Sequence, residues 1–230
     1  MLFRSKVVRQ AEVDELRRFI KPGDVVIDVG AHSGDTAIPM ALAAGREGCV
    51  LALEPNPYVF PVLEKNAELN PDKTHIVALS FAATDRSDDF YFHYSDAGFC
   101  NGGLHAGVSR WRHGHAYRLK VRGENLQTYI AERFADLESR IRFVKVDAEG
   151  YDYEVLASLN DLIVRQRPFI KTEVFTFLSR ERRERLYDFV VQLGYRVFLI
   201  HDEAHYLGGR FERADVMKHS RADLFCVPAT

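Results

Sequence analysis

The feature that most constrains the fold is an unbroken apolar run, VVIDVG from Val25 to Gly30, followed at once by AHSGDTA. A run without polar alternation is typical of a strand buried on both faces of a parallel sheet. Gly30 and Gly34 then mark a tight turn before a helix, and such a turn places backbone N–H groups at the carboxyl edge of the sheet. The segment therefore predicts a ligand site at the switch point of an α/β sheet.

Further short apolar runs, separated by helix-length gaps, extend this pattern over both halves of the chain. They are VLALE, IVAL, RFVKVDAEG, PFIKTEVF, YRVFLI and DLFCVPA. Parallel strands need crossover connections of about this length. Because 230 residues fit one large domain better than two small ones, we predict a single α/β domain over 1–230. It is a doubly wound, mostly parallel sheet with helices on both faces and an N-terminal helix over 1–23.

One segment interrupts this alternation. Residues 95–118 are rich in Gly, His, Asn and Ser, and they form a connection too long for an ordinary loop. We interpret the segment as a candidate substrate lid. It holds one candidate general base, His105, in the compact turn NGGLH. The alternative for this and every other histidine nearby is a solvated loop residue.

Two acids flank the first glycine turn in the predicted sheet. Asp28 lies two residues before Gly30, and Glu54 closes the second apolar run. A carboxylate at Asp28 repels a diphosphate and attracts an ammonium or a sulfonium; the chain also lacks the middle glycine of the GxGxxG fingerprint. An acid in the position of Glu54 accepts both hydroxyl protons of a ribose. The pair predicts a pocket for a cationic nucleoside, whereas either acid alone is equally compatible with a helix cap or a surface ion pair.

Four motifs together suggest a family. VIDVGAHSGDTA, ALEPNP, IVALSFAATDRS and FVKVDAEGYDYEVL resemble the FkbM-type S-adenosylmethionine-dependent methyltransferases, over about Val25 to Phe175. The resemblance implies a Rossmann-like class I methyltransferase fold, a seven-stranded sheet whose last strand is antiparallel, and S-adenosylmethionine as cofactor with S-adenosylhomocysteine as product. It also implies that the donor is bound by Asp28, Gly30, Ala31, His32, Ser33, Gly34, Glu54, Pro55, Asn56, Phe81, Ala82 and Asp147. His32 stands where this family frequently has asparagine.

The KVDAEG segment carries charges on a strand that otherwise reads as buried. Lys145, Asp147 and Glu149 alternate, so an extended strand would point all three to one side. The functional interpretation places Asp147 near the donor's amino group or sulfonium, with Lys145 and Glu149 beside the acceptor as further catalytic residues. The alternative is an internal ion pair with a helix cap. The site is predicted without a metal; Mg²⁺ on Asp147, Glu149 and Glu173 is the other way to activate an acceptor.

The acceptor is predicted to be a hydroxyl. Methyltransferases of exocyclic amines carry N/D-P-P-Y/F after the fourth strand, whereas this chain has Asp147-Ala148-Glu149-Gly150. Because a protonated alcohol is a poor nucleophile, a base must remove its proton during attack. The predicted function is therefore O-methylation of a sugar or a small natural product. An RNA methyltransferase and a non-catalytic nucleoside-binding module are the alternatives.

Charge and cysteine content bear on partners and location. The chain has 31 Lys and Arg against 33 Asp and Glu, so its net charge of -2 provides no field that would draw it to nucleic acid or an anionic membrane. The partner is predicted to be a small molecule or a glycan, with homo-oligomerisation left open. Three scattered cysteines, and no leader or apolar span in the first residues, predict a cytoplasmic protein.

Overall fold

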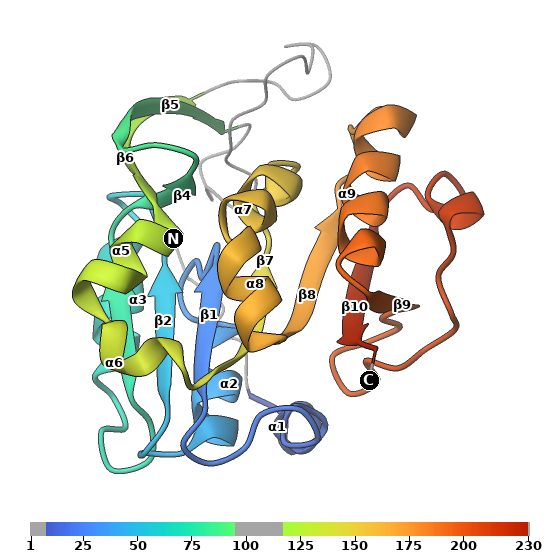
Figure 1. Cartoon of the computed structure of the whole chain (residues 1–230). Helices are drawn as coiled ribbons and strands as arrows, with labels where there is room; N and C mark the ends of the chain where they lie inside the picture. Colours follow the sequence, from blue (N-terminus) through green and yellow to red (C-terminus); the bar gives the residue numbers. More distant parts are fainter. Residues whose placement is uncertain (1–7, 95–116, 230) are drawn as a thin grey trace.

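The computed structural model describes residues 8–94 and 117–229, which form a large sheet with helices on both faces and a second, small sheet (Figure 1). The strands of the large sheet are β1 (Val25–Val29), β2 (Cys49–Leu53), β3 (Ile76–Leu79), β7 (Ile141–Val146), β8 (Phe169–Val174), β9 (Tyr195–Leu199) and β10 (Ala222–Pro228). Their order is β3-β2-β1-β7-β8-β10-β9. β10 is antiparallel to both of its neighbours, β8 and β9, and the remaining strand pairs of this sheet are parallel. The predicted seven-stranded, mostly parallel sheet is confirmed.

Helices cover the large sheet on both faces because the central strand presents apolar residues in both directions. Val25, Ile27 and Val29 belong to one buried cluster and Val26 to the other, as the two-residue period of a strand requires. Side chains of this size contribute about 1.5–3 kcal/mol each when fully buried. The first cluster includes side chains of α5 (Leu126–Arg133), α7 (Asp152–Ser158), α8 (Asn160–Gln166) and α9 (Arg180–Gln192), with α6 (Ala135–Glu138) packed against it; the second includes those of α1 (Gln10–Leu16), α2 (Ala37–Ala44) and α3 (Phe60–Ala67).

The strand order reverses between β1 and β7, and this reversal positions the site. After β1 the chain runs outward to β2 and β3, and it returns on the other side of β1 to form β7. The connections that leave the carboxyl ends of β1 and β7 therefore diverge and leave a crevice, which is where open α/β sheets bind ligands. Asp28 on β1 lies opposite Lys145 on β7 in the register of these two strands.

A three-stranded sheet beyond the carboxyl edge of the large sheet is the main element that the sequence did not predict (Figure 1). It consists of β4 (Ala82–Thr84), β5 (Asp88–Tyr94) and β6 (Tyr117–Asn125), in the order β4-β6-β5. The last two residues of the predicted insertion, 117–118, belong to β6, so that boundary was wrong. The remainder of the insertion, with His105, lies outside the described residues.

The ends of the chain add short elements. Helix α1, Gln10–Leu16, lies within the segment 1–23 where the sequence predicts an N-terminal helix, and residues 1–7 lie outside the described part. A short 3-10 helix, Arg213–Asp215, precedes β10. Within 8–94 and 117–229, every helix is too short or too polar to cross a bilayer.

Candidate active site

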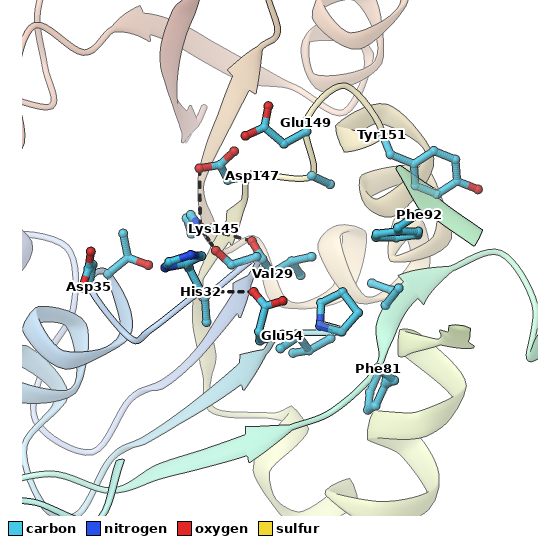
Figure 2. A pocket seen from close by; sticks show the side chains of 18 residues that line it. Val29, His32, Asp35, Glu54, Phe81, Phe92, Lys145, Asp147, Glu149 and Tyr151 are labelled. Carbon is cyan, nitrogen blue, oxygen red and sulfur yellow. Dashed lines mark hydrogen bonds and ion pairs between the residues drawn. The ribbon is translucent and has the colours of Figure 1, made fainter. Parts of the chain in front are cut away.

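A cavity of about 300 Å³ opens at the carboxyl ends of β1, β2 and β7 (Figure 2), within the range of small-molecule pockets. Its wall comes from the ends of these three strands, four connections and two strands of the small sheet, β4 and β5. The lining residues are Val29, Gly30, Ala31, His32, Asp35, Thr36, Leu53, Glu54, Pro55, Phe81, Ala82, Ala83, Phe92, Lys145, Asp147, Ala148, Glu149 and Tyr151.

The cavity is apolar at one end and charged at the other. Figure 2 shows Phe81 and Phe92 on one side, Asp147 and Glu149 on the other, and Glu54 between them. Phe81 is buried, and its ring packs on that of Tyr129 with 4.6 Å between centroids. Such a gradient suits a ligand with an apolar head, a hydroxylated middle and a cationic tail.

The β1–α2 turn uses its own backbone N–H groups internally. Gly30 and Ala31 both donate to the Leu53 carbonyl, at 3.1 and 2.9 Å, and Gly34 donates to the Ala31 carbonyl at 2.8 Å. His32 donates to Glu54 Oε2 at 3.0 Å. The expectation that this turn presents N–H groups to a ligand is therefore wrong for these four residues. A diphosphate would find none of these four donors available here.

Gly30 is required by the close approach of β1 and the segment after β7. Its φ is +76°, and a Cβ added there would lie 2.1 Å from the Asp147 carbonyl oxygen. A side chain at this position would therefore separate the glycine turn from the segment that carries the acids.

Glu54 is positioned as a two-point acceptor. Its side chain is 7% exposed, Oε2 accepts the His32 N–H at 3.0 Å and Oε1 accepts the Asn56 N–H at 2.8 Å. Each carboxylate oxygen keeps a further lone pair, and Glu54 lines the cavity. Burial raises the pKa of Glu54 to about 7, against the two backbone hydrogen bonds, which lower it.

Asp28 does not line the cavity, and the expectation that it faces the ligand is wrong. Because Asp28 alternates with Ile27 and Val29, its side chain lies on the α2 face of β1, where it is fully buried. There Oδ2 accepts a hydrogen bond from Thr36 Oγ1 at 2.7 Å, and Oδ1 lies 3.1 Å from Lys145 Nζ. Asp28 thus stabilises the turn from behind.

Lys145 fixes the same turn from β7. Its Nζ donates to the carbonyls of Val29 at 3.2 Å and Gly30 at 2.8 Å, and it lies 3.8 Å from Asp147 Oδ2. Burial alone would lower the pKa of Lys145, but the negative charges of Asp28 and Asp147 outweigh it and raise the pKa. The ammonium is committed to these groups, so this geometry does not support the predicted role beside the acceptor.

Asp147 and Glu149 lie on the same side of the cavity, but not because they alternate along an extended strand, as the sequence predicted. β7 ends at Val146, and Glu149 has a left-handed backbone with φ of +50°, so the alternation of an extended strand does not reach it. Figure 2 nevertheless shows both carboxylates on the same side. His32, on the facing turn, is also left-handed, with φ of +48°. Non-glycine residues in this region cost about 1–3 kcal/mol each and cluster at functional sites.

The environment of Glu149 raises its proton affinity. Burial and the negative charges of Asp147 and Asp152 together raise the pKa of Glu149 to about 8, although Arg221 and Lys145 lower it. One oxygen of its neighbour Asp147, Oδ1, is buried without a hydrogen-bond partner among the described residues. A carboxyl group of this kind can exchange a proton with a ligand near neutral pH.

The sequence comparison with protein families decides the identity. Residues 28–197 match the model of the methyltransferase FkbM domain, a range that covers most of the chain and includes every described residue of the cavity wall.

The chain belongs to the FkbM methyltransferase family.

Solved structures agree with this fold. The FkbM chain is similar to an FkbM methyltransferase from Methylobacillus flagellatus KT, with a TM-score of 0.54 and 14% identity over 98% of this chain and 46% of that one. It therefore spans less than half the length of that protein. A putative rRNA-methylase from Clostridium thermocellum has a TM-score of 0.54 and 12% identity, over 97% and 98%. An O-methyltransferase from Bacillus cereus in complex with S-adenosylhomocysteine has a TM-score of 0.51 and 12% identity, over 98% and 84%. At these identities the likeness shows the fold alone, and no curated protein matches.

The matched FkbM model describes a methyltransferase domain, and S-adenosylmethionine is the donor that this family implies. The cavity lining is chemically compatible with that donor, because it combines apolar residues, a buried carboxylate that keeps lone pairs and an acidic end. The predicted cofactor is confirmed at the level of the family.

Three residues predicted to bind the donor lie behind the cavity wall. Ser33 Oγ donates to Asp35 Oδ1 at 2.9 Å, and Asn56 Oδ1 accepts the Tyr58 N–H at 2.9 Å. Gly34, with φ of +98°, allows the turn to pass Leu63. None of the three lines the cavity, so they shape the FkbM site without forming its surface.

Other lining residues escaped the sequence reasoning. Phe92 and Tyr151 add aromatic surface, and Asp35 and Thr36 extend the glycine turn toward the charged end. The alternation in DDFYFHY was the available signal for the strand that carries Phe92. Asp35 directly follows Gly34 in the motif VIDVGAHSGDTA, which the sequence analysis had already placed at the ligand site.

The Mg²⁺ alternative has no ligand set in the described part of the chain, where no three His, Cys, Asp or Glu residues are arranged to hold a metal. Glu173, the third ligand of that alternative, forms an ion pair with Arg221 and does not line the donor cavity.

Proposed function

We propose that the protein transfers a methyl group from S-adenosylmethionine to a hydroxyl of a sugar or of a small natural product. The observation that carries this proposal is Glu149, a carboxyl group with a pKa raised to about 8 at the acidic end of the donor cavity. A hydroxyl needs a base to accept its proton, and a base is most effective when its pKa lies near the working pH.

The cavity gives each part of the donor a place in this proposal. The purine lies at the apolar end, against Phe81, Ala82 and Phe92. The ribose hydroxyls donate to Glu54, whose oxygens keep free lone pairs. The cationic end lies toward Asp147, whose Oδ1 lacks a hydrogen-bond partner within the described ranges. The donor supplies a methyl group on a positively charged sulfur.

The chain's own contribution to the reaction is alignment and proton transfer. Glu149 accepts the hydroxyl proton as the acceptor oxygen bonds to the methyl carbon, and the electron pair of the breaking C–S bond returns to sulfur. Asp147 favours the sulfonium while it is positively charged. Lys145 keeps the glycine turn against β7 through two backbone carbonyls, which preserves the in-line geometry on which such a displacement depends.

Calorimetry and methyl transfer test the proposal together. We expect S-adenosylmethionine and S-adenosylhomocysteine to bind, and labelled methyl to appear on oxygen in a panel of sugars and natural products. Methyl transfer only to nitrogen would overturn O-methylation. Binding without any transfer would favour the non-catalytic module, and transfer to RNA that weakens steeply as salt rises would favour the RNA enzyme.

Replacing Glu54 with glutamine is expected to raise the Kd of S-adenosylhomocysteine by about 10- to 100-fold. A glutamine amide faces one of the two backbone N–H groups that Glu54 now satisfies, and an unsatisfied buried donor costs about 1–3 kcal/mol. Since ribose hydroxyls prefer the ionised carboxylate, wild-type affinity should also rise from pH 6 to 8, through the pKa of about 7. Glu64→Gln, on the exposed face of α3, should leave the Kd unchanged; equal loss in both variants would remove Glu54 from the donor site.

The remaining predictions on partners and location stay proposals. They are a small-molecule or glycan acceptor, no nucleic acid or membrane partner, homo-oligomerisation as a possibility left open, and a cytoplasmic location. Cys49 and Cys226 are buried free thiols, in line with the last of these.

A further inference from the structure

A second, smaller cavity lies beside the donor cavity at the carboxyl ends of β7 and β8. Its volume is about 80 Å³, which is enough for several water molecules. It shares Thr36, Lys145 and Asp147 with the donor cavity, and its other lining residues are Val146, Lys171, Thr172, Glu173, Glu203, Arg221 and Asp223. A cavity of this size accommodates a short polar arm of an acceptor but not a sugar ring.

The three cations on the wall of this second cavity are already paired. Lys171 Nζ lies 2.6 and 2.8 Å from the two carboxylate oxygens of Glu203. Arg221 Nε contacts Glu173 Oε1, and Lys145 lies 3.1 Å from Asp28. An anionic ligand would have to displace an existing partner from one of these groups. The wall therefore discriminates against acceptors that carry a negative charge there.

Carboxylate oxygens on the same wall lack donors. Glu173 is 1% exposed, and its Oε2, like Asp147 Oδ1, has no hydrogen-bond partner among the described residues. Asp223 on β10 lies directly opposite Glu173 on β8, and like charges opposite one another destabilise a sheet. Burial, followed by the charge of Asp147, raises the pKa of Glu173 against the effect of Arg221.

We propose that the second cavity is an acceptor subsite that binds a small protonated amine, carried by the acceptor close to the hydroxyl that is methylated. An ammonium offers several N–H donors and a positive charge, and it would supply the donors that Glu173 Oε2 and Asp147 Oδ1 lack among the described residues. The shared Asp147 places the amine next to the donor's charged end. The substrate class is therefore an amino alcohol or an amino sugar. This inference rests on the proposed function, because it presumes that the neighbouring cavity holds the donor.

Three two-carbon probes of matched size test the subsite. Ethanolamine, ethylene glycol and glycolate share one hydroxyl and differ in an ammonium, a hydroxyl or a carboxylate at the other carbon. Their binding to the full chain, saturated with S-adenosylhomocysteine, is measured by nuclear magnetic resonance titration. We expect ethanolamine to bind about tenfold more tightly than ethylene glycol, which corresponds to about 1.4 kcal/mol, and glycolate to bind most weakly.

Substitutions in the wall of the second cavity test whether its carboxylates cause the preference for ethanolamine. Glu173→Gln should reduce the ethanolamine preference to within about twofold, and Asp223→Asn, at a less buried position, serves if the first variant folds poorly. Glu154→Gln is the matched control, because Glu154 also pairs with an arginine, Arg182, and has a buried oxygen without a partner, yet it lines neither cavity. The control should keep the full preference.

The outcomes separate the subsite from the reaction. Equal binding of ethanolamine and ethylene glycol, tightest binding of glycolate, or a preference that survives both Glu173→Gln and Asp223→Asn would overturn the subsite, even if methyl transfer to oxygen occurs elsewhere. Labelled methyl on the nitrogen of ethanolamine would overturn O-methylation, while the binding order would still support the subsite.

Discussion

Replacing Glu149 with glutamine is expected to lower kcat for methyl transfer by about 100- to 10,000-fold, the usual contribution of a positioned general base. The amide keeps the size and the hydrogen-bonding reach of the side chain but cannot accept a proton. The Kd of S-adenosylhomocysteine should change by less than about threefold, because donor contacts at the apolar end and at Glu54 stay in place. Single-turnover transfer of labelled methyl at saturating donor measures the effect.

Two comparisons make that result specific. Glu154→Gln changes the same residue type outside the cavity wall and should retain wild-type kcat. Asp147→Asn should weaken donor binding more than Glu149→Gln does, because Asp147 lies toward the sulfonium in the proposed arrangement. If Glu149→Gln keeps kcat within tenfold of wild type, another group is the base.

The pH profile should carry the same signature. Because the pKa of Glu149 is raised to about 8, the carboxyl group is mostly protonated at pH 7 and becomes an available base as the pH rises. We therefore expect kcat/KM for the acceptor to rise about tenfold per pH unit below its apparent pKa and to level off above it. A bound sulfonium near Glu149 favours the ionised carboxylate and lowers that apparent pKa. Glu149→Gln should abolish this rise of kcat/KM with pH. A kcat/KM that falls as the pH rises from 6 to 8 would contradict the assignment of Glu149 as the general base.

Replacing Lys145 with methionine is expected to lower the free energy of unfolding by about 3–5 kcal/mol, the usual cost of leaving one charge of a buried pair unpaired. Asp28 is fully buried and would lose its cation, and the carbonyls of Val29 and Gly30 would lose a donor. This change is a large share of the 5–15 kcal/mol that separates folded from unfolded domains. Urea unfolding measures it.

A second substitution shows whether the charge of Asp28 is responsible. Adding Asp28→Asn to Lys145→Met removes the unpaired carboxylate and should recover more than half of the lost stability, since a neutral amide costs less to bury. If the double variant is no more stable than Lys145→Met alone, the lysine acts through its backbone hydrogen bonds instead.

The sequence was sufficient for the sheet, the glycine turn and Glu54. Local apolar runs in the sequence indicate buried strands. An acid that ends such a run in a parallel sheet lies at the carboxyl edge of the sheet, whichever strands are its neighbours. Asp28 was misplaced because its partner, Lys145, is brought opposite it only by the pairing of β1 with β7. Glu149 lines the cavity as predicted, but the predicted reason, alternation along an extended strand, was wrong. β7 ends at Val146, and Glu149 lies in the turn that follows, with a left-handed backbone.

The small sheet was missed for a different reason. Its strands are separated by residues 95–116, so the pairing of β5 with β6 has no short turn to signal it. The aromatic wall at Phe92 depends on that long-range pairing. Local patterns therefore located the acidic end of the cavity better than the apolar end.

The internally satisfied turn after β1 has a consequence for selectivity among abundant metabolites. Adenine dinucleotides and adenosine triphosphate share a purine and a ribose with the methyl donor. Because four amides already serve Leu53, Ala31 and Glu54, a phosphate chain would gain no hydrogen bond from them in return for the water it gives up. Inhibitors aimed at this pocket should accordingly keep the nucleoside and replace the phosphates with a positively charged or neutral tail.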